Sequence, residues 1–338
     1  MKAVGFYKNL PIGDEQSLVD LELPEPEPGP RDLLVDVHAV SVNPVDTKVR
    51  RNAAPPDGQA RVLGFDAAGI VRAVGSAVSL FKPGDRVWYA GSIARPGSNA
   101  QRQLVDERIV GRLPQRLDFA QGAALPLTAI TAWELLFDRL QVRRDSSGES
   151  LLVIGAAGGV GSILVQLARR LTGLRVIGTA SRPETRAWVE GLGAHDVIDH
   201  SRPLNEELRR IGVAQIDYVA SLTQSDRHYD AVVDALKPQG RLGLIDDPAT
   251  PLDVMKLKRK ALSLHWEMMF ARPVFETPDM IEQHQLLNAV ADLVDAGTLV
   301  TTVGEHFGRI DAANLRRAHA LIESGTARGK IVLEGFGS

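Results

Sequence analysis

The sequence predicts an α/β fold with two domains, one built on a doubly wound parallel sheet and the other on short β-strands. Three observations lead to this expectation. The chain has 338 residues, which is too long for one ordinary core. Its first third consists of short β-like runs broken by turn residues. After Pro126, apolar strands alternate with amphipathic helices.

The N-terminal region is expected to form a compact all-β unit. Strands are predicted at 33–37, 69–74 and 86–89, and Pro83-Gly84-Asp85 supplies a turn before the last of them. The stretch from Pro24 to Arg31 alternates proline with acidic residues and glycine, so we expect a rigid surface connection there.

The middle of the chain predicts the parallel sheet. An amphipathic helix from Thr128 to Leu140 leads into a continuous apolar strand, and strands then alternate with helices. The strands are expected at 151–154, 174–179, 196–198, 216–220 and 240–245, and the helices at 160–171, 183–191, 204–211 and 227–236. This alternation is typical of βαβ units and of a doubly wound sheet.

The C-terminal region is expected to rejoin the first domain. One more strand is predicted at 262–266 and a helix at 277–296, but the segment from Phe270 has no core of its own. The predicted domains are therefore a discontinuous one, 1–126 with 270–338, and an inserted one, 127–269, although the hydrophobic pattern alone leaves this question open.

The amino-acid composition excludes several classes of function. Hydrophobic residues make up 44% and charged residues 24%, which is typical of a folded globular protein. A net charge of -3 lacks the basic excess that binds nucleic acid. Because residues 1–13 have no signal-peptide apolar core and no apolar run reaches ~18 residues, we expect a cytoplasmic protein without membrane association. Cysteine is absent, which excludes disulfides, thiolate nucleophiles and Cys-containing zinc sites.

A glycine cluster at the junction of strand 151–154 and the following helix predicts a dinucleotide site of the Rossmann type. Glycines allow a sharp turn and close approach to a pyrophosphate, whose charge meets the N–H groups of the helix start. The spacing differs from strict G-x-G-x-x-G by one inserted residue. The expected cofactor-binding residues here are Gly155, Gly158, Gly159, Val160 and Gly161.

The next strand indicates which dinucleotide is bound. An acidic residue after it would hydrogen-bond the ribose diol and repel a 2′-phosphate, but the residues present are Ala180-Ser181-Arg182. The hydroxyl of Ser181 and the guanidinium of Arg182 suit a phosphate monoester, so NADPH is the expected cofactor. The alternative is that Arg182 is an ordinary solvated charge at a helix start.

Four motifs resemble the medium-chain dehydrogenase/reductase superfamily, and within it the quinone oxidoreductase and ζ-crystallin-like branch. They are VNPVDT at 42–47, GFDAAG at 64–69, PGDRV at 83–87 and AAGGVG at 156–161. The likeness spans essentially the whole chain. It implies a GroES-like β domain beside the Rossmann domain, and an oxidoreductase often described as zinc-type alcohol dehydrogenase-like.

The sequence departs from the superfamily pattern at the positions of the zinc ligands. The superfamily's Cys, His and Cys ligands correspond here to Asn43, Phe65 and Leu127, and two of these offer no lone pair. The four-Cys structural-zinc lobe is also missing. We therefore expect no metal in this protein.

The resemblance also implies three further cofactor contacts. Thr131 matches a threonine near the nicotinamide, His200 a residue near the adenosine phosphate, and Lys330 a basic residue facing the cofactor phosphates. The alternatives are a helix hydroxyl bonded to its own backbone, a simple turn histidine and a solvated lysine. Lys48 and Asp246 depart from the resemblance, because many quinone reductases have Tyr and Gly at those positions.

Without zinc as a Lewis acid, the favoured substrates are quinones, enones or other activated carbonyls, which accept hydride readily, in a cleft between the domains. Asn43 is the candidate donor to the developing oxyanion, and Lys48 the candidate for added positive charge or proton relay. The alternatives are a zinc-free alcohol or carbonyl dehydrogenase, and a non-catalytic protein that senses NADPH or binds AU-rich RNA. An apolar edge strand near 262–269 predicts a homodimer.

Overall fold

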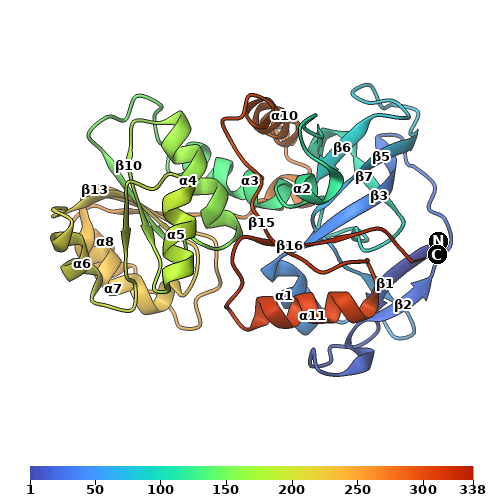
Figure 1. Cartoon of the computed structure of the whole chain (residues 1–338), viewed down its shortest axis with the longest axis horizontal. Helices are drawn as coiled ribbons and strands as arrows, with labels where there is room; N and C mark the ends of the chain where they lie inside the picture. The colour runs from blue at the N-terminus through green and yellow to red at the C-terminus, as the bar shows by residue number, and fades with distance from the viewer. Residues whose placement is uncertain (338) are drawn as a thin grey trace. The chain divides into compact units, whose positions relative to one another are not determined.

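The computed structural model describes residues 1–337 and divides into two compact units (Figure 1). Unit 1 comprises Met1–Ile130 together with the chain from Phe270 onward, and unit 2 comprises Thr131–Met269. Within the described residues, no helix has both the length and the apolar character needed to cross a bilayer.

Unit 1 is built on a seven-stranded sheet whose main path is β15-β16-β3-β5-β6-β8, with β7 also paired to β3, and on a small sheet of order β2-β1-β4. The strands are β1 (Lys2–Phe6), β2 (Val19–Glu22), β3 (Asp32–Val42), β4 (Arg61–Val62), β5 (Ala67–Val74), β6 (Arg86–Tyr89), β7 (Arg102–Asp106), β8 (Val110–Arg112), β15 (Val303–His306) and β16 (Lys330–Glu334). The last strand, β16, is antiparallel to β3 and places Ile331 opposite Val42.

The helices of unit 1 are short except for two near its C-terminal end. They are α1 (Pro44–Asn52), α2 (Phe119–Ala123), α9 (Ala271–Phe275), α10 (Glu282–Asp295), α11 (Ala312–Glu323), and the 3-10 turns η1 (Glu15–Ser17) and η2 (Glu107–Ile109). α3 (Pro126–Trp133) contains the boundary between the units. α1 begins with Pro44 and a capping box in which Asn43 and Asp46 satisfy each other's backbone N–H groups.

Unit 2 contains a six-stranded sheet of order β11-β10-β9-β12-β13-β14, in which every pair is parallel. The strands are β9 (Ser150–Ile154), β10 (Arg175–Thr179), β11 (Asp196–Ile198), β12 (Ile216–Ser221), β13 (Leu236–Leu244) and β14 (Ser263–Trp266). The helices are α4 (Gly159–Leu171), α5 (Pro183–Gly191), α6 (Leu204–Arg210), α7 (Ser225–Ala235) and α8 (Met255–Lys258). Numbered within unit 2, the strand order is 3-2-1-4-5-6, and the predicted doubly wound parallel sheet of the Rossmann type is confirmed.

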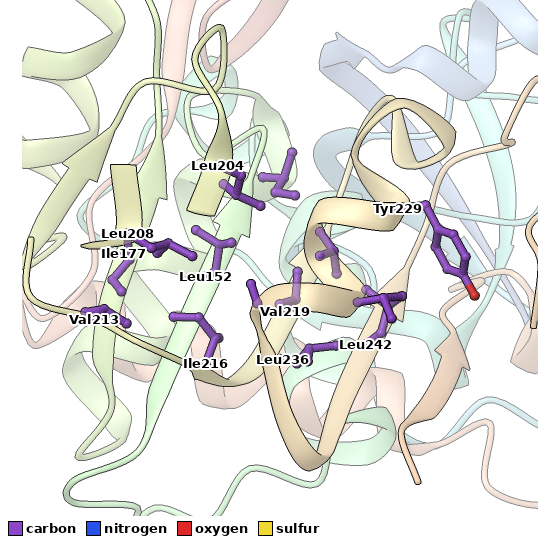
Figure 2. Packing of buried hydrophobic residues seen from close by; sticks show 14 of the residues in the cluster. Leu152, Ile177, Leu204, Leu208, Val213, Ile216, Val219, Tyr229, Leu236 and Leu242 are labelled. Atoms are coloured by element: carbon purple, nitrogen blue, oxygen red, sulfur yellow. The ribbon is translucent and has the colours of Figure 1, made fainter. Parts of the chain in front are cut away.

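Helices cover both faces of the unit 2 sheet, with α4 and α5 on one face and α6, α7 and α8 on the other (Figure 1). Figure 2 shows the core of the second face, where side chains of β9, β10, β12 and β13 meet those of α6 and α7. Its labelled members are Leu152, Ile177, Leu204, Leu208, Val213, Ile216, Val219, Tyr229, Leu236 and Leu242. Burial on both faces explains why β9 is continuously apolar rather than alternating.

Several predicted boundaries need correction. The strand expected at 33–37 extends through Asp32–Val42, because it is shared by three neighbouring strands. The helix expected at 128–140 is α-helical only to Trp133 and continues as the π-helical segment η3 (Glu134–Arg139). The helix expected at 277–296 is the shorter α10, preceded by the separate single-turn α9.

Candidate functional site

The predicted glycine loop of unit 2 is closely packed between β9 and α4. Gly155 directly follows β9 and has φ +82, a conformation that side chains disfavour. A Cβ on Gly161 would lie 2.3 Å from the Gly155 carbonyl oxygen, so only glycine lets α4 come this close to the strand. Gly158 is the N-cap of α4 in an extended conformation, and its carbonyl accepts from Ser162 N–H at 2.9 Å.

The first turn of α4 presents the backbone donors of this loop. The N–H groups of Gly159, Val160 and Gly161 precede the first intrahelical bond, which Ser162 donates. Gly159 and Val160 are half-buried. With the positive end of a 13-residue helix behind them, these amides suit a pyrophosphate.

Ser181 and Arg182 follow β10, the strand next to β9. Ser181 is exposed and Arg182 is half-buried. Arg182 is the N-cap residue of α5, and its Nε lies 3.2 Å from an Oε of Glu184. Both side chains therefore lie just beyond the carboxyl end of a strand adjacent to the glycine loop, on the side where open parallel sheets bind ligands.

His200 lies two residues beyond β11, at the same edge of the sheet. Its ring makes an edge-to-face contact with His228 of α7 at a centroid distance of 6.3 Å. Burial lowers the pKa of both imidazoles. His200 Nδ1 is buried and has no hydrogen-bond partner among the described residues.

A second polar group, fully enclosed within unit 1, contains Asn43 and Lys330. Lys330 Nζ lies 3.0 Å from the Val42 carbonyl oxygen, 2.6 Å from Asn43 Oδ1 and 3.1 Å from Asp66 Oδ2. Asn43 Nδ2 donates to Asp66 Oδ2 at 2.8 Å, and Ser41 Oγ donates to the same oxygen at 2.8 Å. An ammonium group has three N–H donors, so all of those of Lys330 have acceptors here.

Asp66 and Asp46 complete this group. Asp66 Oδ1 accepts from the Leu127 backbone N–H at 2.8 Å. Asp46 accepts from the backbone N–H groups of Asn43, at 2.7 Å, and Gly64, at 3.0 Å. Burial raises the pKa of Asp66 against the opposing effect of Lys330, and burial raises the pKa of Asp46 to about 7.

The structure shows the surroundings of four of the predicted site residues. The enclosed ammonium of Lys330 is directed at protein oxygens of unit 1, which differs from the phosphate-facing environment expected for it. The amide of Asn43 is held by Lys330 and Asp66. Lys48 is half-buried on α1, and Thr131 is buried on α3 at the first position of unit 2.

The residues at the predicted zinc positions do not fit a metal. Phe65 is buried with its ring edge-on to Phe270, at a centroid distance of 5.4 Å. Leu127 has an apolar side chain, and the Asn43 amide oxygen accepts from an ammonium group. Among residues 1–337, no three His, Asp or Glu side chains cluster as a metal site would need.

Sequence reasoning did not identify Asp46 and Asp66 as members of the site. Both lie within motifs that carry the resemblance, and Asp66 is flanked by apolar residues that the structure buries. An acidic residue inside an apolar run is a signal for a buried ion pair, because a buried carboxylate requires a partner. Its partner, Lys330, lies too far along the chain for any local pattern to reveal it.

Comparison with known proteins identifies the family. Residues 29–123 match the family described as alcohol dehydrogenase GroES-like domain, and residues 192–333 match the zinc-binding dehydrogenase family. A zinc-type alcohol dehydrogenase-like protein of Staphylococcus aureus is 40% identical over 98% of this chain and 99% of its own length.

Solved structures support the same family assignment. A Rhizobium etli protein provisionally described as a zinc-dependent alcohol dehydrogenase superposes with TM-score 0.96 at 58% identity, covering 100% of this chain and 99% of the other. Escherichia coli quinone oxidoreductase, solved with NADPH, gives TM-score 0.84 at 26% identity, covering 99% and 100%. The chain is thus an oxidoreductase and belongs to the medium-chain dehydrogenase/reductase superfamily.

Proposed function

We propose that this protein is an NADPH-dependent reductase that transfers hydride to a quinone, an enone or another activated carbonyl without zinc. The observation that carries the cofactor assignment is the pairing of the glycine loop at α4 with Ser181 and Arg182 after the neighbouring strand. A hydroxyl and a guanidinium at this position, with no acidic residue at 180–182, favour the 2′-phosphate.

The proposed substrate class follows from the residues at the positions of the superfamily's zinc ligands. The positions Asn43, Phe65 and Leu127 supply no tetrahedral zinc site, so an acceptor that needs no Lewis acid is favoured. When bound, the reduced nicotinamide supplies the hydride. Asn43 is the proposed donor to the oxyanion and Lys48 the proposed source of positive charge or of a proton. Thr131 and His200 are the proposed contacts to the nicotinamide and adenosine ends.

Isothermal titration of the purified, metal-free protein with NADPH and then NADH tests the cofactor assignment. We expect NADPH to bind at least about tenfold more tightly, a difference of about 1.4 kcal/mol. Arg182→Ala should weaken NADPH binding and leave NADH binding unchanged. Arg209→Ala, which removes an exposed arginine of α6, is the matched control. Equal affinities for both cofactors in the wild type would contradict the phosphate argument.

A turnover screen of quinones and enones against simple alcohols and ketones tests the substrate class. Turnover of alcohols alone would favour the alternative of a zinc-free alcohol or carbonyl dehydrogenase. Asn43→Ala should lower kcat for an accepted quinone or enone, and unchanged kinetics would remove Asn43 from the mechanism. Failure to bind either cofactor would contradict the enzyme assignment for this chain.

We also propose a homodimer formed through β14. This strand is at the edge of the unit 2 sheet, and Trp266 at its end is 51% exposed. Met268, two residues later, is 49% exposed. An uncovered edge with apolar side chains favours pairing with a second copy of the chain.

A further inference from the structure

The N-terminus of α7 in unit 2 is capped by a residue from outside the helix and its preceding loop. The residue before the helix, Gln224, has φ +50 and forms no side-chain cap hydrogen bond. Instead, Asp246, which follows β13, accepts from the Ser225 backbone N–H at 2.9 Å and from the Ser225 hydroxyl at 2.5 Å. The carboxylate thereby satisfies a donor at the positive end of an 11-residue helix.

The hydrogen bonds continue from Asp246 to the middle of the sheet. Ser225 Oγ lies 2.8 Å from Ser221 Oγ, at the end of β12. Since the only hydroxyl proton of Ser225 is directed to Asp246, Ser221 is the donor in this contact. Ser221 is paired with Ile154 of β9, and the Leu222 N–H donates to the Ile154 carbonyl oxygen at 3.2 Å. Asp246 is thus connected to the residue that precedes the glycine loop.

The segment held in this way packs against the glycine loop itself. A Cβ built on Gly155 would lie 3.0 Å from Thr223 Cγ2 and 3.6 Å from Leu222 Cβ. Gly155 is the residue at which the chain turns from β9 toward α4, with φ +82. A shift of residues 222–223 would therefore change the space available to this turn, and with it the direction of the first amides of α4.

We propose that Asp246 is a positioning residue for dinucleotide binding. Through Ser225 it holds residues 221–224 against Gly155, and so maintains the turn that presents the α4 amides to a pyrophosphate. This inference rests on the proposed function, because it assumes that the dinucleotide binds at α4. It also gives a role to an aspartate that departs from the family resemblance.

Calorimetric titration with NADPH and steady-state kinetics with an accepted quinone test this role in the full-length protein. Asp246→Ala should raise the Kd for NADPH about fivefold, which corresponds to about 1 kcal/mol of binding free energy. It should also raise the KM for NADPH more than it lowers kcat. Ser225→Ala should have a smaller effect in the same direction, and Ser225→Thr, which keeps the hydroxyl, should restore wild-type binding. Asp226→Asn removes a carboxylate from the same helix turn and serves as the control.

The binding stoichiometry of each variant reports its folded fraction, so a loss of folding is distinguished from a loss of affinity. If Asp246→Ala does not fold, the comparison of Ser225→Ala with Ser225→Thr decides the question. An unchanged Kd in the folded variants, accompanied only by a lower Tm, would overturn the positioning role. If the wild type binds neither NADPH nor NADH, the proposed function itself fails, and this is known before any variant is measured.

Discussion

Lys330 Nζ lies 2.6 Å from Oδ1 of Asn43, although 287 residues separate them in the chain. The contact joins the start of the last strand, β16, to the residue that follows β3, and it is enclosed within unit 1. Asn43, the proposed oxyanion donor, therefore has its amide orientation set by a buried cation. The same cation neutralises Asp66.

Replacing Lys330 by Met should destabilise unit 1 severely. The substitution leaves Asp66 and the Asn43 carbonyl buried without their cation, and breaking one side of a buried ion pair costs about 3–5 kcal/mol. Urea unfolding followed by circular dichroism measures the change. Lys82→Met, at an exposed lysine paired with Asp85, should have little effect. A loss below about 1 kcal/mol for Lys330→Met would show that the buried group relaxes or admits water.

Acid should destabilise the protein through His319 of α11. His319 is fully buried, and neither ring nitrogen has a hydrogen-bond partner among the described residues. Burial, with a smaller contribution from Arg50, lowers the pKa of His319 to about 3. In the unfolded chain His319 binds a proton near pH 6.5, whereas in the folded protein it stays neutral down to about pH 3. Above pH 6.5 His319 is neutral in both states, and the free energy of unfolding has its full value. The contribution of His319 is then lost at about 1.4 kcal/mol per unit as the pH falls toward 3.

His319→Leu should remove this dependence. Between pH 7 and pH 5, the free energy of unfolding of the variant should fall by about 2 kcal/mol less than that of the wild type. His306→Leu, at an exposed histidine of β15, should follow the wild-type curve. Parallel curves for His319→Leu and the wild type would mean that His319 finds a partner for its proton in the folded state.

Rising pH should weaken unit 2 through Glu267. Burial and the neighbouring Glu134 raise the pKa of Glu267, and the Arg139 guanidinium, 2.8 Å away, opposes the shift. The folded protein therefore retains a proton that the unfolded chain releases near pH 4.5, and stability falls as the pH rises above that value. Glu267→Gln should flatten the curve between pH 5 and pH 9 in urea unfolding. Glu206→Gln, on the exposed face of α6, should leave it unchanged.

Trp266→Asp should abolish the proposed dimer. The substitution places a charge on the β14 edge, where a second copy would pair. Size-exclusion chromatography with light scattering should give twice the 36.6 kDa chain mass for the wild type and a single chain mass for the variant. Phe275→Asp, at a side chain that is 77% exposed in unit 1, is the control. A monomeric wild type at micromolar concentration would contradict the dimer.

The doubly wound sheet was predictable because its signals are local. Apolar strands such as β9 alternate with amphipathic helices, and this alternation is typical of βαβ units in a parallel sheet. The π-helical segment after Trp133 was not predictable, because its periodicity differs only slightly from that of an α-helix. It depends on tertiary packing rather than on local propensity.

The glycine loop and the buried side-chain contacts also differ in how far the sequence could predict them. The glycine loop is contiguous in sequence, and its close packing at Gly161 follows from residue type alone. The contacts of Asn43 with Lys330, and of Asp246 with Ser225, depend on strand pairing between distant segments. Sequence inspection identified both Lys330 and Asp246, but their partners required the register of β16 against β3 and of β13 against β12.

The position of β16 has a consequence for the order in which the protein folds during synthesis. Every strand of unit 2 has been synthesised once Trp266 leaves the ribosome, so that unit can form its whole sheet early. Unit 1 begins first but needs its last strands. Until Lys330 emerges, Asp66 has no cation and the end of β3, from Ala39 to Val42, lacks its β16 partner. A nascent chain arrested before residue 330 therefore exposes a template for aggregation, which chaperones would be expected to cover.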